Sequence, residues 1–344
     1  HSEDPLVSYG RAALGDYLAG YEGRLMRSLK SLLGTSMMED STEVMGQAMP
    51  FRKLLSHFIG ELKQRAETSA GASFDKVVLG RPVFFIDEDP KADQLAEQTL
   101  REIAADAGFK DIEFQYEPIA AAFDYEATIS REELVLVADI GGGTSDFSLV
   151  RVGPQQRRRL DRQGDILANH GVHIAGTDFD RHVELARILP TCGYRALGPT
   201  GREVPSKVYF DLATWHLINT VYAPGRVAEL ARMKSFYAEA RQHRRLMTLV
   251  AERLGHALIG QAEAAKIAVA EGGATQIDLR ALEAGLQATL DEPQALAALD
   301  ADIDRITAAA DDTLAQAGVP RERVGALYFT GGSTGLRPLA ARIA

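Results

Sequence analysis

The residues with the clearest chemical pattern form the segment Asp139–Asp146 (DIGGGTSD), which lies between two apolar runs. Gly141–Gly143 carry no Cβ, so the backbone N–H groups of this turn can approach an anion closely. Asp139 ends the first apolar run and is placed to hold a hydrated Mg²⁺, which prefers one or two carboxylates with waters and phosphate oxygens. Thr144 offers a hydroxyl to a phosphate or to water. An ordinary hairpin with a flexible glycine tip is the alternative interpretation.

A second glycine-rich turn, Gly331–Gly335 (GGSTG), follows the apolar run at 324–330. Two turns of this kind, each directly after a strand, indicate two contacts to phosphate or nucleoside from two related halves of a protein. A loop near the C-terminal end of the chain, without a binding role, is the alternative.

The elements around these turns alternate between short strands and helices, which is typical of layered α/β proteins. Short apolar runs predict strands at 76–80, 134–138, 147–152 and 324–330. Apolar periodicity and helical composition predict helices at about 50–70, 91–107, 246–270 and 295–317. The strands on either side of Asp139–Asp146 predict a hairpin with the glycines at its tip. From about 178 to 272 the composition is strongly helical, which indicates a helical lobe inserted into an α/β protein.

Composition excludes several classes of protein. The 344 residues suggest two domains or one bilobal unit, and the net charge of −10 argues against nucleic acid as a partner. The single cysteine, Cys192, excludes an intramolecular disulfide and fits a reducing compartment. No apolar run is long enough to span a bilayer. We therefore expect no membrane partner and a cytoplasmic location.

Six motifs resemble, in the same order along the chain, the ATPase of the DnaK-type chaperones, the heat shock protein 70 family. They are Leu29–Gly34 (family pattern IKRLIG), Tyr116–Ala122 (NEPTAAA), Asp139–Asp146 (DLGGGTFD), Ile174–Asp180 (LGGEDFD), Glu263–Lys266 (ExAK) and Gly331–Thr334 (GGST). Pro82 also matches the proline of the family's VPAYF strand, which is associated with communication between the nucleotide and a partner domain. A proline at a strand edge is the alternative interpretation of Pro82.

The resemblance implies an actin-like ATPase fold of the α/β class, bilobal, with duplicated ribonuclease-H-like cores and an inserted helical subdomain. The first lobe would cover residues 1–135 and the second 136–344, with the insertion at about 181–272. No match to the family's first phosphate loop, Asp-x-Gly-Thr-Thr, precedes Lys30, so the first N-terminal strands are expected to be missing from this chain. The pattern resembles the short YegD-like branch of the family, which lacks the peptide-binding domain.

The resemblance also implies a role for each matched residue. Transfer of a phosphoryl group from ATP to water needs a metal, neutralised phosphate charge and a positioned water. Lys30 would bring a cation to the γ-phosphate, and Glu117 would orient the attacking water or accept its proton. Asp139 would hold Mg²⁺, and Thr144 would cradle phosphate with the three glycines. The other nucleotide-binding positions would be Gly141, Gly142, Gly143, Gly176, Glu263, Lys266, Gly331, Gly332 and Ser333.

Some of these residues have simpler interpretations. Glu263 and Lys266 lie three residues apart, on one face of a predicted helix, and would reach the ribose and base, but they could equally form a surface ion pair. Lys30 could be a solvated helix lysine. The arginine that follows GGST in the family is Gly335 here, and Arg337 lies two positions further on.

The function implied by the resemblance is that of an ATP-binding, slowly hydrolysing, Mg²⁺-dependent chaperone-like ATPase. ATP or ADP would be its ligand, and protein clients or co-chaperones are candidate partners. A nucleotide-sensing regulatory or scaffold module without hydrolysis is the alternative, favoured by the missing first loop and by Gly335 and opposed by Lys30 and Glu117. A sugar or carboxylate kinase of the same fold is a third interpretation.

Overall fold

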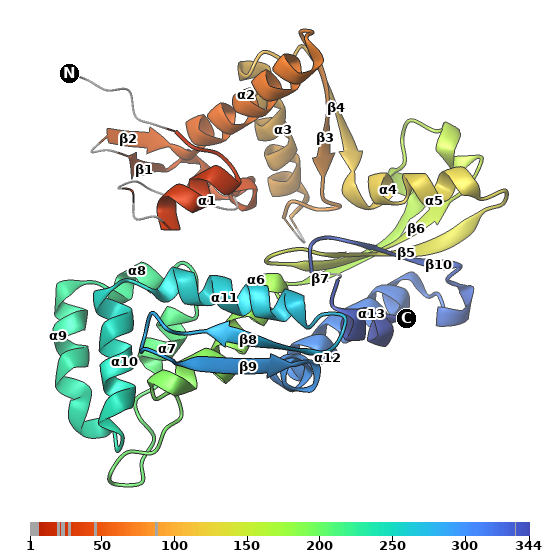
Figure 1. The fold of residues 1–344 in the computed structure, drawn as a ribbon. Coiled ribbons are helices and arrows are strands. Elements are labelled where there is room, and N and C mark those ends of the chain that lie inside the picture. The colour runs from red at the N-terminus through yellow and green to blue at the C-terminus, as the bar shows by residue number, and fades with distance from the viewer. Residues whose placement is uncertain are drawn as a thin grey trace. The chain divides into compact units, whose positions relative to one another are not determined.

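The computed structural model describes residues 7–18, 21, 25–26, 29–44, 47–86, 89–333 and 335–344 (Figure 1). The chain divides into two compact units. Unit 1 comprises residues 1–124 together with 160–163, and unit 2 comprises residues 125–159 together with 164–344. Both units combine helices with strands, so the mixed α/β class predicted from the sequence is confirmed. The predicted lobe boundary at 135/136 stays a prediction.

Unit 1 leads from short elements into a strand–helix–strand segment. Its elements are α1 (Arg11–Leu18), the 3₁₀ helices η1 (Leu29–Leu32) and η2 (Ser36–Glu39), β1 (Ser41–Val44), β2 (Gln47–Pro50), α2 (Phe51–Ala70), β3 (Lys76–Arg81), α3 (Pro90–Asp106), β4 (Asp111–Tyr116) and α4 (Glu117–Ala121). β1 pairs antiparallel with β2, and β3 pairs parallel with β4. Helix α5 (Phe123–Thr128) crosses the boundary between the two units in sequence.

The core of unit 1 is formed by α2, α3 and the β3–β4 pair. Leu55 and Ile59 lie one turn apart on α2, and Leu100 and Ile103 lie three residues apart on α3. Each helix therefore buries one face, and Ile112 of β4 belongs to the same buried cluster. The helices predicted at 50–70 and 91–107 are found at 51–70 and 90–106.

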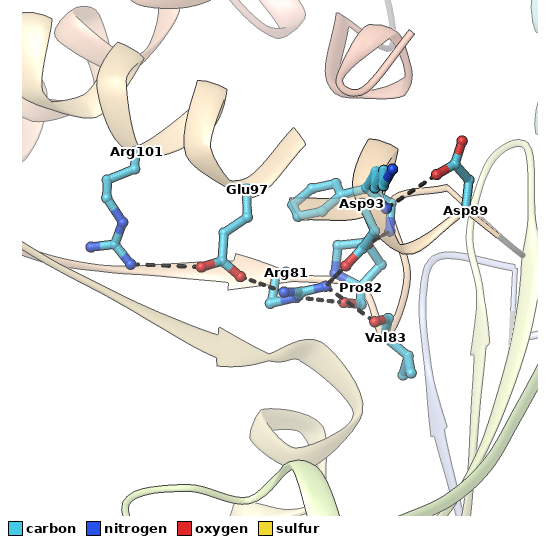
Figure 2. Close-up of polar contacts among 9 residues, drawn as sticks. Arg81, Pro82, Val83, Asp89, Asp93, Glu97 and Arg101 are labelled. Atoms are coloured by element: carbon cyan, nitrogen blue, oxygen red, sulfur yellow. Dashed lines mark hydrogen bonds and ion pairs between the residues drawn. The ribbon is translucent and has the colours of Figure 1, made fainter. Parts of the chain in front are cut away.

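Arg81, at the end of β3, ties this strand to α3 (Figure 2). Its side chain is only 9% exposed and forms ion pairs with Asp93 at 2.9 Å and with Glu97, one turn further along α3. Such partners are required, because an unpaired buried charge is strongly destabilising. Arg81 also donates to the carbonyl oxygens of Pro82 at 3.1 Å and Val83 at 3.2 Å. Pro82 directly follows the strand, and its carbonyl and that of Val83 are bound by the Arg81 side chain.

Unit 2 contains a four-stranded sheet in the order β10-β5-β6-β7. The strands are β5 (Glu133–Ile140), β6 (Ser145–Val152), β7 (Ile166–Val172) and β10 (Ala326–Thr330). β5 pairs antiparallel with β6, which confirms the predicted hairpin, and β10 runs parallel to β5. β7 pairs antiparallel with β6 and was not predicted, because its sequence mixes polar and apolar residues without regular alternation.

The remaining elements of unit 2 are mostly helical. They are η3 (Gln156–Arg158), η4 (Gln163–Asp165), α6 (Gly176–Val183), the π-helical turn η5 (Glu184–Ile188), η6 (Leu189–Cys192), α7 (Lys207–Leu212), α8 (Ile218–Val221), α9 (Pro224–Arg232), η7 (Met233–Phe236), α10 (Ala240–Ala251), α11 (Gly255–Ala268), β8 (Ala274–Asp278), β9 (Gln287–Asp291), α12 (Glu292–Ala317), η8 (Arg321–Arg323) and α13 (Arg337–Ile343). β8 and β9 form an antiparallel hairpin.

Two buried clusters hold unit 2 together. In the first, Ile303 and Ile306 of α12 pack with Phe147 and Leu149 of β6. The second joins the helices α7, α10 and α11 with the β8–β9 hairpin. The single helix predicted at 246–270 is wrong, because Arg253 adopts a left-handed conformation (φ 51°) and separates α10 from α11. Within the described part of the chain, no helix is both long and apolar enough to cross a membrane.

Candidate functional site

The candidate site in unit 2 is the turn between β5 and β6. Ile140 pairs with Ser145, so residues 141–144 form a four-residue hairpin loop, closed by a hydrogen bond from the Gly141 N–H to the Thr144 carbonyl at 3.0 Å. Asp139 is half-buried near the end of β5, and Thr144 is exposed. The hairpin thus brings together the carboxylate, the three glycines and the hydroxyl that the sequence predicts to act on phosphate.

The carbonyl oxygens of the loop are bound from one side. Gly141 O accepts the Gly176 N–H at 3.2 Å and the Ser333 hydroxyl at 2.9 Å. Gly142 O accepts the N–H of Thr177 at 2.7 Å and the hydroxyl of the same residue at 2.8 Å. The first turn of α6 and Ser333 therefore fix the orientation of two successive peptide groups.

Fixing the carbonyls also fixes the N–H groups that follow them. A trans peptide directs its N–H opposite to its C=O, and no cis peptide occurs in the structure as described. The N–H groups of Gly142 and Gly143 therefore point away from α6 and Ser333. No hydrogen-bond acceptor contacts either group among the described residues. A Cβ added to Gly142 or Gly143 would meet no heavy atom within 4 Å. Two adjacent donors thus face open space, as in backbone sites that bind anions.

The second glycine-rich turn is locked to the end of β5. The Ser333 N–H donates to the Ile140 carbonyl at 3.0 Å. Gly331 has φ 91°, and a Cβ there would lie 2.4 Å from Ile140 O and 2.7 Å from an Asp139 carboxyl oxygen, so only glycine fits. Gly332, in contrast, borders open space. Thr334, the last residue of the GGST motif, lies outside the described residues.

Lys266 and Glu263 lie on α11 in different surroundings. Lys266 is buried, and its ammonium group lies 2.6 Å from Asp180 and donates to the Gly176 carbonyl at 3.3 Å. Glu263 is exposed. The two side chains, predicted on one helix face, therefore differ in accessibility, and the structure pairs Lys266 with Asp180 of α6.

In unit 1, the fold brings Lys30 and Glu117 together across 87 positions of sequence. Lys30 lies in η1, Glu117 opens α4, and the two side chains form an ion pair in which they are 47% and 38% exposed. A Cβ on Gly80 would lie 3.3 Å from a Glu117 carboxyl oxygen, so the end of β3 approaches this pair closely. The two residues that the resemblance assigns to hydrolysis are thus direct neighbours.

Sequence reasoning did not single out Thr177 and Asp180. Both lie in the Ile174–Asp180 motif, where Thr177 replaces the family's Glu, but nothing in a linear motif shows that Thr177 binds Gly142 or that Asp180 binds Lys266. Tertiary packing alone brings these residues to the glycine loop and to α11.

The residues of the loop fit a nucleotide phosphate with Mg²⁺. Two free N–H donors and an exposed hydroxyl suit phosphate oxygens. Asp139 supplies one carboxylate beside them, as Mg²⁺ requires when waters and phosphates complete its shell. Across the described residues, no group of three or more His, Cys, Asp or Glu side chains could hold a metal by itself. Mg²⁺ would therefore depend on Asp139, water and the phosphates together.

Comparisons with known proteins agree with these motifs. Residues 30–185 match the family model described as Hsp70 protein. The chain is 29% identical to the chaperone protein DnaK of Thermosipho africanus over 162 residues, and this matched stretch covers 46% of this chain and 24% of that protein. It is 30% identical over 170 residues to the chaperone protein HscA homolog of Pseudomonas paraeruginosa, 49% of this chain and 25% of that protein.

The chain therefore spans about a quarter of the length of the curated relatives it matches. These similarities support a relationship to the Hsp70 family, and the mixed α/β structure is consistent with the actin-like ATPase fold of that family. The matched region includes the glycine loop 141–144 and the first turn of α6.

Proposed function

We propose that this chain binds Mg²⁺ with ATP or ADP at the loop 139–144 and acts as a chaperone-type ATPase of the Hsp70 family, within its short YegD-like branch. One observation carries the binding proposal. The carbonyls of Gly141 and Gly142 are bound from one side, so the N–H groups of Gly142 and Gly143 are directed into open space on the other. Such a pair of preorganised donors recognises an anion without further rearrangement.

Each group near the loop has a defined part in this proposal. The N–H groups of Gly142 and Gly143 and the hydroxyl of Thr144 bind phosphate oxygens, and Asp139 holds Mg²⁺, which neutralises phosphate charge. The resemblance to the Hsp70 motifs implies that the turn 331–333, Glu263 and Lys266 receive the adenosine. Because the ammonium group of Lys266 is paired with Asp180, we assign this part to the turn and to Glu263. Protein clients or co-chaperones are the further partners that we propose from the same resemblance.

We assign the hydrolytic step to Lys30 and Glu117 of unit 1, which form an ion pair with each other, because the resemblance to the Hsp70 motifs implies these roles. Water attacks the γ-phosphorus, the bond from that phosphorus to the oxygen of ADP breaks, and the water proton passes to Glu117 before release to solvent. Lys30 stabilises the negative charge of the transferred group. The contact between the two side chains supports this assignment, because it holds the proposed proton acceptor and the cation together.

Phosphate binding is tested by calorimetric titration with ATP in the presence of Mg²⁺. Gly142→Ala places a methyl group in the open space beside the donors, and we expect at least tenfold weaker ATP binding, about 1.4 kcal/mol. Gly164→Ala is the matched control, because a Cβ there also meets nothing within 4 Å but lies outside the loop. Equal ATP affinity of the two variants would contradict the proposed site.

Hydrolysis is tested separately by steady-state release of phosphate. Lys30→Ala and Glu117→Ala should each abolish turnover while ATP still binds. Undiminished turnover in both variants would refute the assigned roles. Tight binding without turnover in the unaltered protein would instead select the nucleotide-sensing module.

A further inference from the structure

Helix α6 supports the glycine loop through its first residues. The N–H groups of Gly176 and Thr177 donate to the carbonyls of Gly141 and Gly142. These bonds use donors that a helix leaves unpaired at its N-terminus. The orientation of the loop thus depends on where the first turn of α6 is held.

The first turn of α6 is itself held by Lys266 of α11. The ammonium group donates to the Gly176 carbonyl at 3.3 Å and forms an ion pair with Asp180 at 2.6 Å. Both side chains are 11% exposed, so the pair is shielded from solvent. Its attraction is therefore much less screened than that of a surface pair.

The residue one turn after Asp180 is a second buried carboxyl group, Glu184. It is fully buried at the start of the π-helical turn η5, and neither of its carboxyl oxygens has a hydrogen-bond partner among the residues that the structure describes. Burial is the larger cause, and the nearby Asp180 charge the smaller cause, that raises the pKa of Glu184 well above its ordinary range. The raised pKa favours the neutral acid at Glu184, and the carboxylate that pairs with Lys266 is that of Asp180.

We propose that Asp180 and Lys266 form an anchor that positions the glycine loop for the phosphates of a nucleotide, with Lys266 acting through the Gly176 carbonyl instead of through the ligand. We call this pair the α6 anchor. The inference rests on the proposed nucleotide binding and deepens it, because it makes the anchor a determinant of affinity for phosphate and not for adenosine. Both members are positioning residues, since neither needs to touch the nucleotide.

The test uses the double variant Asp180→Asn/Lys266→Met in the full chain. Lys266→Met alone would remove the cation beside the buried Asp180 carboxylate and could prevent folding, whereas the double variant removes both charges. Asp211→Asn/Lys207→Met is the matched control, because it applies the same changes to another Lys–Asp pair of unit 2, with a distance of 3.1 Å. Lys266→Arg keeps the positive charge and should retain most of the affinity for ATP.

Calorimetric titration with ATP in the presence of Mg²⁺, and separately with adenosine, measures the affinity for the whole nucleotide and for its nucleoside part. We expect the double variant to bind ATP at least tenfold more weakly than the unaltered protein does, while its affinity for adenosine stays the same. Equal loss for both ligands would show that Lys266 contacts the nucleoside and would overturn the inference, as would unchanged affinity for ATP.

Hydrogen exchange without nucleotide supplies a readout that does not depend on the proposed function. The amides of Gly176 and Thr177 should exchange at least tenfold faster in the double variant than in the unaltered protein and the control. Unchanged exchange there would overturn the anchor. If the unaltered protein does not bind ATP, the proposed function fails, while the exchange result still decides the anchor.

Discussion

Glu184 shows how a single residue can carry an electrostatic cost inside unit 2. Its side chain is fully buried, has no hydrogen-bond partner in the described part of the chain, and has a raised pKa mainly because of this burial. A raised pKa means that the folded state prefers the protonated acid. The contribution of protonated Glu184 to the stability of the folded state is therefore fully present below the ordinary pKa of a glutamate. This contribution is lost as the pH rises through the pKa that Glu184 has in the folded state.

We therefore predict that Glu184→Gln raises the Tm of the protein at pH 8, because the amide stays neutral at every pH whereas the buried carboxyl group is disfavoured in its charged form. The difference in Tm between the variant and the unaltered protein should shrink as the pH falls towards 4. Thermal unfolding followed by circular dichroism at both pH values measures this. Glu263→Gln, at an exposed position of α11, is the control and should not change with pH in this way. A variant less stable at pH 8 than at pH 4, relative to the unaltered protein, would contradict the prediction.

At the scale of elements, two turns far apart in sequence are interlocked at the ends of neighbouring strands. β10 runs parallel to β5, with Thr330 opposite Asp139, so the residues that follow each strand meet at one edge of the sheet. Gly331 and Ser333 then contact Ile140 and Gly141 directly. The loop that we propose to bind phosphate is therefore held by hydrogen bonds to the turn that follows β10.

Gly331→Ala should lower the free energy of unfolding by about 2 kcal/mol or more, because the left-handed φ and the close Ile140 carbonyl leave no room for a methyl group. Gly332→Ala is the matched control, with open space around the position, and should change stability by less than about 0.5 kcal/mol. Urea unfolding of both variants compares them. Similar midpoints would mean that the two turns are not packed as described.

A second element-scale contact is the connection from β3 to α3 in unit 1. Arg81→Met removes the buried cation that Asp93 and Glu97 share, although Glu97 keeps an ion pair with Arg101 at 3.7 Å, and we expect a loss of about 3 kcal/mol. Lys76→Met, at the other end of β3, removes an exposed ion pair with Asp111 and should cost much less stability than Arg81→Met. Urea unfolding followed by circular dichroism measures both. Equal small losses would show that the buried network contributes little.

At the scale of the whole molecule, the two units have separate hydrophobic cores. Among the described residues, one buried cluster belongs to unit 1 and two belong to unit 2. Cys192, the single cysteine of the chain, lies fully buried in the helical cluster of unit 2. Burial raises the pKa of its thiol to about 12, so almost no reactive thiolate exists at neutral pH.

Cys192 should therefore report the unfolding of unit 2. We predict that a maleimide reacts at pH 7.5 at least 100-fold more slowly with the native protein than with the protein in urea. The urea dependence of labelling should follow the unfolding of unit 2, which hydrogen exchange of β5 and β6 measures independently. Rapid labelling without denaturant would show that the helical cluster is open.

Local sequence patterns were sufficient to predict the helices, strands and turns whose conformation depends mainly on residues close together in the sequence. The apolar face of α2, the hairpin of β5 and β6 and the glycines between them follow from the order of residue types, because helix periodicity, strand propensity and the absence of a Cβ act within a few residues. The order of residue types does not predict the break at Arg253 or the strand β7, because a left-handed residue and an irregular strand gain their stability from packing. Three features of the candidate site arise only when distant segments come together: the contact of Lys30 with Glu117, the pairing of Lys266 with Asp180, and the direction of the loop carbonyls. Each depends on hydrogen bonds and charges between residues far apart in the sequence, so local sequence patterns do not predict it.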